Sequence, residues 1–432
     1  MRSYSALFRT PEFTTLFLSA SLRLAASTVG GLARGTLTYR ATGSPLLTAL
    51  SMFGPQLAQV LGATTLLSAA DRLPPRATLT GIALGFAVGT AAMAMPGLPI
   101  WALFGIVFLL GLIASLGGGV GWGLLNEILA KKGEGGYLLG RSVFNMANGL
   151  MQIAGYATGG ILVAAFSPQV TLLLAAALHL AAALVAAVGL THRPPRASGR
   201  PSIAQTWRTN AQLWAARPRR LTYLGLWIPN GLVVGVESLY VSYDPGSAGT
   251  LFACAALGML IGDVTIGRFV PPRLRRRLAV PLLLLLAVPN LLFAFGPGVW
   301  VAALTVCVAS VGYGASLVQQ ERLMSLTPPE LSGHALGLHS AGMLTMQGVS
   351  AALAGTIAQL TSPGAAMALM AAGSVCVTVG LVVAGRRTER GRAENGCATP
   401  AAREEMGVTY APGPRGRDST GSPRGTHPDD DA

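Results

Sequence analysis

Residues 273–298 of the chain are RLRRRLAVPLLLLLAVPNLLFAFGPG, in which a cluster of arginines leads into an apolar run that ends in a Gly-Pro-Gly turn. The run at 278–295 carries no charged residue. A helix of about 20 apolar residues crosses a hydrocarbon core of roughly 30 Å. Because a segment in lipid must satisfy its own backbone hydrogen bonds, this run is predicted to be a membrane-spanning α-helix.

The same pattern recurs along most of the chain. Of its 432 residues 51% are hydrophobic and only 11% are charged, whereas soluble domains carry about 25% charged residues. Turns rich in Gly and Pro separate twelve predicted spans. These spans are 13–38, 45–70, 77–96, 99–125, 142–164, 169–190, 221–242, 247–267, 278–295, 299–320, 335–360 and 364–385.

The basic residues fix the expected orientation. The formal net charge is +14, and 20 of the 31 basic residues lie in the N-terminus and in every second loop, while the intervening loops hold only Arg40. Basic residues concentrate in cytoplasmic loops. We therefore expect a multi-pass protein of the cytoplasmic membrane with both termini inside. Charges that follow this rule need no nucleic-acid partner, and none is expected.

Composition changes divide the chain into five predicted segments. They are a cytoplasmic N-terminus (1–12), a six-helix bundle (13–190), a cytoplasmic central loop (191–220), a second six-helix bundle (221–386) and a disordered cytoplasmic tail (387–432). The tail is rich in Gly, Pro, Arg and Asp, which is typical of disorder. Trp207 and Trp214 predict a surface-lying helix in the central loop.

Two pairs of similar short segments indicate an internal repeat. The segment 71–76 (DRLPPR) resembles 268–273 (RFVPPR) at an offset of 197 residues. Met151-Gln152 with Gly160 is repeated by Met346-Gln347 with Gly355 at an offset of 195. The predicted fold is therefore all-α, with twelve transmembrane helices in two parallel six-helix halves. In such transporters the substrate site lies between the halves near the middle of the membrane.

The chain resembles the major facilitator superfamily over about residues 5–386. The family has a basic motif after its second span, and Asp71, Arg72 and Arg76 match it, although prolines replace its usual Gly and Arg. In the second half, Arg273 remains and Arg268 stands where an acid is usual. The resemblance implies that these residues gate the cytoplasmic side.

The fifth span is similar to a glycine motif of exporters in this family, Gly-Pro-x-x-Gly-Gly. Here Gly155, Gly159 and Gly160 match it and Tyr156 replaces the proline. The loop at 319–330 also resembles drug-efflux members from high-G+C, actinobacterial-type bacteria. The resemblance implies export, whereas the plainer interpretation is that a crowded transmembrane helix needs small residues.

Charged residues inside spans are costly and are therefore the first candidates for function. Arg23 lies about ten residues into the first span, and Arg34 lies eleven residues, or about three turns, further on nearly the same face, with Ser27 between them. This cationic stripe either lines the central cavity and binds an anionic group, or is structural, with Arg23 in an ion pair and Arg34 reaching the outer surface.

Further candidates lie on the spans expected to face the cavity. Glu237, near the outer end of the seventh span, is placed by depth to meet Arg34 or to carry a proton. Trp122 and Tyr313 are either cavity walls or interface anchors. Gln319 is the last of the substrate or cavity candidates.

Charges near the cytoplasmic ends of spans are expected to form the inner gate. These gating candidates, beyond the motif residues, are Glu127, Arg141, Asp263, Glu321 and Arg322. Salt bridges at the inner gate are the favoured role. Asp263 is expected in the gating network or in helix packing more than as a proton site.

The function classes narrow accordingly. No phosphate-binding loop is present in the sequence, so ATP is not the expected energy source. No clustered His or acidic residues predict an enzyme, a metal site or a cofactor, and none is expected. We predict a secondary transporter of a small molecule, coupled to protons, monomeric in the lipid bilayer and working in efflux. An importer of a small, anionic metabolite is the alternative, and a non-transporting sensor or scaffold is a remote one.

Overall fold

A computed structural model of the chain describes residues 7–70, 74–117, 120–130, 136–194 and 203–396. Within these residues the regular structure is helical, and eleven helical segments are long and apolar enough to cross a membrane. The twelfth span is α7 (Gly136–Ala165), whose 30 residues reach about 45 Å at 1.5 Å per residue. The prediction of an all-α polytopic membrane protein is confirmed.

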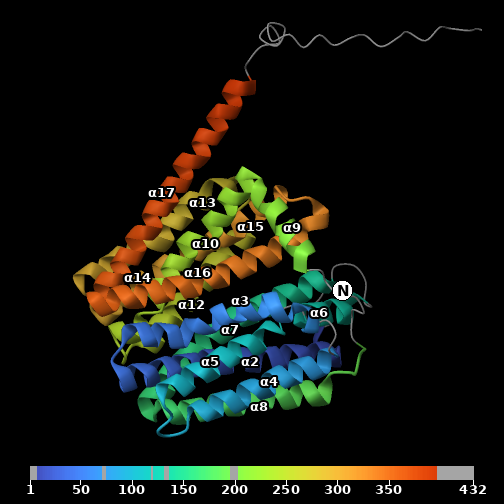
Figure 1. The fold of residues 1–432 in the computed structure, drawn as a ribbon, viewed down its shortest axis with the longest axis vertical. Coiled ribbons are helices and arrows are strands. Elements are labelled where there is room, and N and C mark those ends of the chain that lie inside the picture. The colour runs from blue at the N-terminus through green and yellow to red at the C-terminus, as the bar shows by residue number, and fades with distance from the viewer. Residues whose placement is uncertain (1–6, 71–73, 118–119, 131–135, 195–202, 397–432) are drawn as a thin grey trace, which may run out of the picture. The chain divides into compact units, whose positions relative to one another are not determined.

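The first six spans form one half of the molecule, shown in blue to green in Figure 1. They are α2 (Pro11–Thr42), α3 (Pro45–Ala70), α4 (Pro75–Met93), α5 (Ile100–Ser115) followed by α6 (Val120–Ala130), α7, and α8 (Pro168–Gly189). Several begin with proline, which fits the first helical turn because the N–H it lacks has no partner there. Gly43, at φ +62°, ends α2 and donates its N–H to the Tyr39 carbonyl.

The last six spans form the second half, and the helix α9 (Ile203–Ala215) precedes them. They are α10 (Arg217–Glu237) with α11 (Tyr240–Tyr243), α12 (Ala248–Val264) with η1 (Thr265–Phe269), α13 (Pro272–Ala287) with η2 (Val288–Phe295), α14 (Val299–Val311) with η3 (Gly312–Gly314) and α15 (Ala315–Ser325), η4 (Pro329–Leu331) with α16 (Ser332–Leu360), and α17 (Pro363–Gly396). Five of these six spans change helix type along their length or break into shorter helices.

Two predicted features of the connecting segments can be compared with the structure. The helix expected around Trp207 and Trp214 is α9, and the Trp214 ring stacks on Trp227 of α10 at 5.6 Å. The last helix, α17, continues to Gly396, ten residues past the predicted boundary at 386. Residues 397–432 of the predicted tail lie outside the described residues.

Successive spans run in opposite directions, so the loops alternate between two ends of the molecule (Figure 1). At one end the connections are brief, and we call it the short-loop end. Its loops are 43–44, 94–99, 166–167, 244–247, 296–298 and 361–362. The opposite end contains most of the loop arginines, including Arg193 and Arg275, and we call it the basic end.

The two halves meet along two helix pairs, α3 with α16 and α7 with α12. At the short-loop end the backbones nearly touch. A Cβ atom on Gly355 would lie 2.6 Å from the Leu46 Cα, and one on Gly160 would lie 2.9 Å from the Gly249 Cα. Small residues allow helices to approach this closely in lipid. The short-loop end is therefore closed.

The contacts between halves extend to about the middle of the spans. Gly149 of α7 packs against Leu260 of α12, and Gly348 of α16 packs against Leu57 of α3. Between described residues at the basic end, the hydrogen bonds and ion pairs stay within one half or involve the segment that connects the halves. In the part of the chain that the structure describes, the two bundles are therefore closed against each other at the short-loop end.

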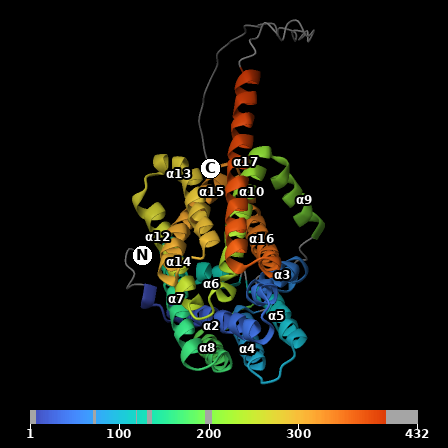
Figure 2. The same ribbon diagram turned by 90° about the vertical axis from the view of Figure 1, so that its left-hand side faces the viewer.

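The largest buried apolar cluster lies at the closed end of this junction. It combines Leu32 of α2 with Val236, Leu251 and Met367 of the second half, and Met52 of α3 packs against it. Burial of apolar surface here holds the halves together on one side. Figure 2 shows the same helices from the side.

Glycine packing inside the first half gives a direct test of the fold. A Cβ on Gly111 of α5 would lie 2.6 Å from the Pro55 carbonyl oxygen of α3, whereas one on Gly105 of the same helix would meet nothing within 4 Å. We expect Gly111→Ala to lower the free energy of unfolding by about 1–3 kcal/mol because α3 must move. Gly105→Ala should leave it unchanged or raise it by up to ~1 kcal/mol. Thermal unfolding of the two purified variants in detergent measures the difference, and equal midpoints would contradict the helix pairing.

Candidate functional site

A buried carboxylate lies at the closed part of the junction. Glu237 is the last residue of α10 and is 7% exposed. The Tyr313 hydroxyl of η3 donates a hydrogen bond to Glu237 Oε1 at 2.9 Å. The seventh and tenth spans thus meet at an ionisable group, and the structure brings together two of the predicted cavity residues.

Three aromatic rings from both halves cover this carboxylate region. The Tyr156 ring of α7 stacks on Phe252 of α12 at 4.8 Å, and Tyr240 of α11 meets the same Phe252 edge-on at 5.0 Å. Tyr156 also interacts electrostatically with both Glu237 and Arg34. We call these six side chains the junction cluster: Arg34, Tyr156, Glu237, Tyr240, Phe252 and Tyr313.

Arg34 enters the junction cluster from α2 of the first half. Its Nε is buried and has no hydrogen-bond partner. The ion pairs between described residues include none between Arg34 and Glu237, so the contact expected from their similar depth is absent in this state. Tyr156 lies within electrostatic range of both charges.

The other candidates on α2 lie on an open face of the helix. Arg23 and Ser27 are exposed although they lie well inside the span. A Cβ on Gly31 would meet no heavy atom within 4 Å, which leaves space beside them. Neighbouring helices therefore leave this face of α2 uncovered.

The remaining cavity candidates are not in the junction cluster. Gln319 of α15 is buried, its Oε1 has no partner, and it packs against Gly225 of α10. Trp122 of α6 is 39% exposed, and the Arg141 guanidinium lies over its ring at 5.6 Å. Gln319 therefore lines the interior of the second half, and Trp122 pairs with a residue predicted for the gate.

The gating candidates of the first half lie at the basic end. Asp71 and Arg72 lie outside the described residues, and Arg76 is half-buried near the start of α4. Arg193 binds Glu127 at 3.1 Å and Glu12 at 2.6 Å. These pairs fasten the connecting segment to the first half and do not reach the second.

The gating candidates of the second half are mostly in contact with solvent. Arg275 bonds to the carbonyls of Val270 and Gly267 and approaches Glu321 at 3.9 Å. The other candidates there, all exposed, are Asp263, Arg268, Arg273 and Arg322. The described gating candidates at the basic end thus form two groups, one on each half.

The predicted exporter motif serves helix packing. A Cβ on Gly155 would lie 2.9 Å from the Thr28 Cβ, and one on Gly159 would lie 3.2 Å from the Val29 Cα, both on α2. Gly160 faces Gly249 across the junction. The three glycines therefore allow α7 to pack closely against α2 of its own half and against α12 of the other half.

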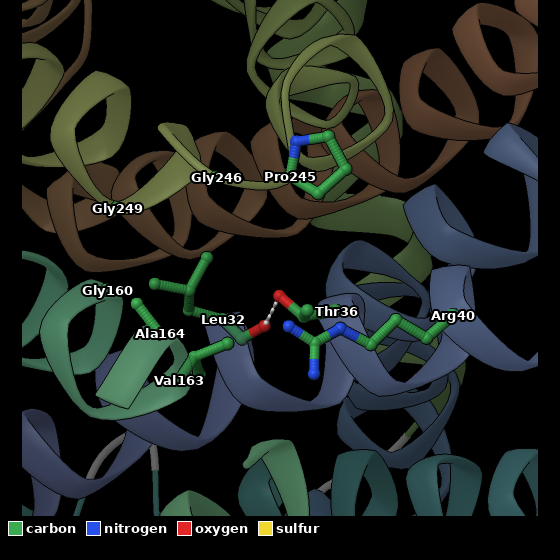
Figure 3. A pocket seen from close by; sticks show the side chains of 9 residues that line it. All are labelled: Leu32, Thr36, Arg40, Gly160, Val163, Ala164, Pro245, Gly246 and Gly249. Atoms are coloured by element: carbon green, nitrogen blue, oxygen red, sulfur yellow. Dashed lines mark hydrogen bonds between the residues drawn. The ribbon is translucent and has the colours of Figure 1, made fainter. Parts of the chain in front are cut away.

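A pocket lies at the short-loop end beside the Gly160–Gly249 contact (Figure 3). Its empty volume is about 440 Å³ with the open mouth included. Thr36 and Arg40 of α2 line one side, and Pro245 and Gly246 line the other. Gly160 and Gly249 also line it, so the pocket borders the closed junction.

Sequence reasoning missed several of these residues as members of a site. In the sequence Tyr156 stands out only as a replacement for proline, and nothing marks Tyr240 or Phe252 as site residues. Arg193 and Arg275 are indistinguishable there from the other loop arginines. Aromatic residues at predicted span ends are the one pattern that could have drawn attention to Tyr240.

Comparison with known proteins establishes the fold. A variant of the nucleoside transporter NupG is 13% identical with a TM-score of 0.69, covering 86% of this chain and 99% of that one. A POT family transporter in complex with a thioalcohol-conjugated peptide is 12% identical with a TM-score of 0.69, covering 87% and 96%. The peptide transporter POT in complex with sulfate is 14% identical with a TM-score of 0.68, covering 90% and 99%.

No protein-family model and no curated protein matches the sequence. At these identities the structural likeness concerns architecture. The chain has the major facilitator fold, with twelve transmembrane helices in two six-helix halves.

Proposed function

We propose that the chain is a secondary transporter that moves a small molecule across the cytoplasmic membrane by alternating access, driven by protons and working in efflux. The observation that carries this proposal is the junction itself. Among the described residues the close contacts between the halves run from the short-loop end to mid-span, and a buried carboxylate, Glu237, lies where the halves meet.

Alternating access needs a junction that can open. The contacts at the short-loop end are mainly between small residues and apolar side chains, with one hydrogen bond, from Ser44 Oγ to Gln359 Oε1 at 3.2 Å. Rocking of one half against the other breaks few polar bonds there. In the opposite state the short-loop end opens and the charged groups of the basic end meet across the two halves.

Proton coupling is assigned to Glu237. A carboxyl group that alternates between a dry junction and water binds and releases protons as its surroundings change. Opening the short-loop end would part Tyr156 from Phe252, the two rings that stack across the halves beside Glu237. The conformational change and the protonation of Glu237 are thereby linked.

Orientation and direction rest on separate arguments. The basic end is cytoplasmic by the positive-inside rule, with both termini on that side. Export is favoured by the packing of Gly155, Gly159 and Gly160, which resembles the exporter motif. Import with the same fold is the competing direction.

Transport in proteoliposomes tests this proposal. The full chain is reconstituted with a pH-sensitive dye inside the vesicles, and a panel of small molecules is added with and without an imposed pH gradient. A transporter moves at least one of them, with proton movement in the opposite direction for efflux and in the same direction for import. Transport that is unchanged when a protonophore collapses the gradient would rule out proton coupling.

A further inference from the structure

Among its described residues, the first half contains positive charge in its interior without a carboxylate beside it. Arg23 and Arg34 lie within α2, well away from both ends of the span. Among the described residues from 13 to 189, the acidic side chain is Glu127, which binds Arg193 at the basic end. Charged side chains inside the membrane are normally paired. The described residues of this half therefore supply no counter-ion to either arginine.

The side chains around these arginines do not supply the missing charge. The buried Arg34 Nε has no hydrogen-bond partner, and neither does Nδ1 of His179 on α8. His179 is 1% exposed and interacts electrostatically with both arginines. An imidazole is either neutral or positive, so it cannot neutralise a guanidinium.

The acid of the other half is already engaged. Glu237 accepts its hydrogen bond from Tyr313, and the described ion pairs do not join it to Arg34. Tyr156 interacts electrostatically with both side chains. A buried charge left without a partner is strongly destabilising, so an anionic ligand would stabilise the arginine face.

The same face of α2 has room for a ligand. Arg23 and Ser27 are exposed, and a Cβ on Gly31 would meet nothing within 4 Å. At 3.6 residues per turn, Arg23, Ser27, Gly31 and Arg34 lie within about 80° of one another around the helix. The exposed Arg23 and Ser27, the open space at Gly31 and the unpaired Arg34 Nε thus lie on one stripe of the helix.

We propose that this arginine face of α2, made of Arg23, Ser27, Gly31 and Arg34, binds an anionic group, a carboxylate or a phosphate, on the transported molecule. The proposal rests on the transport function argued above and names its substrate class. The planar guanidinium matches carboxylate and phosphate oxygens with two parallel hydrogen bonds. The anion supplies both the charge and the acceptor that Arg34 lacks.

Thermal unfolding of the purified full chain in detergent tests the site without any transport. Inorganic phosphate is titrated against chloride at constant ionic strength and pH 7, and glutarate is titrated in a parallel series. A ligand that binds the folded state raises Tm as its concentration passes Kd. We expect a saturable rise of at least ~2 °C for one of the two anions.

Variants locate the effect. Arg34→Gln should lose the rise, Arg23→Gln should weaken it, and Arg208→Gln, at an exposed position on α9, should keep it. Without anion, Arg34→Gln should unfold at the wild-type temperature or above it, because an unpaired buried charge has been removed. A structural ion pair with Glu237 predicts the opposite: a lower Tm for Arg34→Gln that Glu237→Gln restores.

Three outcomes would overturn the proposal. They are no rise with either anion, a rise that Arg34→Gln retains, and a rise given only by phosphatidylglycerol micelles, which would assign the site to a lipid headgroup. Because the readout is binding, failure here leaves vesicle transport untouched. If the vesicles move neutral solutes while neither anion changes Tm, the proposal that the substrate is anionic is wrong and the proposed transport function still stands.

Discussion

Glu237→Gln is expected to reduce proton-driven transport to the level of protein-free vesicles. The amide keeps the shape of the side chain and can still accept the hydrogen bond that Tyr313 donates at 2.9 Å, but it cannot ionise. The junction therefore still closes, while the group proposed to carry the proton is lost. Dye-reported proton movement and solute flux, measured in the same vesicles under an imposed pH gradient, give the result.

Two controls separate coupling from folding. Exchange of solute across vesicles without a gradient should persist in Glu237→Gln, because binding and rocking do not need the proton. Tyr313→Phe keeps the ring and removes the donor, and it should weaken coupling without abolishing it. Accumulation by Glu237→Gln at the wild-type rate would show that another group carries the proton.

Locking the short-loop end is expected to stop transport completely. In a chain whose four cysteines (Cys254, Cys307, Cys376 and Cys397) are replaced by alanine, Ser44→Cys and Gln359→Cys are introduced together. The native side chains are hydrogen-bonded across the halves at 3.2 Å, so a short bifunctional thiol reagent joins the pair. Alternating access requires this contact to part in every cycle.

The matched control places the cross-link inside one half. The Ser19 hydroxyl of α2 donates to the Ala182 carbonyl of α8 at 2.9 Å, and a Ser19→Cys/Ala182→Cys link should leave transport intact because the half moves as a unit. A reducible reagent should restore flux in the Ser44–Gln359 pair on cleavage. Undiminished flux through the linked pair would mean that the halves do not separate there.

The sequence was sufficient for the architecture because the strongest energetic terms are local. An apolar run such as 278–295 has to be a helix in lipid, and arginines such as Arg273 distinguish the loops of the basic end from those of the other end. What these terms do not determine is the helix type within a span. The π turn at Thr265–Phe269 and the 3₁₀ turns at Val288–Phe295 and Gly312–Gly314 depend on neighbours distant in sequence.

The candidate site was predicted in part for the same reason. Glu237 and Arg34 stood out because a charge inside a span is costly. Tyr156 carries no charge, and its role comes from stacking on Phe252, a residue of a different half. In the sequence Arg193 resembles the other loop arginines, whereas in the structure it forms ion pairs with both Glu12 and Glu127. Such partners are set by tertiary packing and leave no pattern in one sequence.

Solvent access to Ser27 tests alternating access most directly, since it needs no substrate. Ser27→Cys is placed in the cysteine-free chain and treated with a membrane-impermeant maleimide in sealed vesicles of either orientation. The chain that carries Ser27→Cys alone is compared with one that also carries the linked Ser44→Cys/Gln359→Cys pair. We expect labelling from the basic end in both chains, and labelling from the short-loop end only in the chain without the cross-link. Labelling from the short-loop end through an intact cross-link, or from neither side, would contradict alternating access.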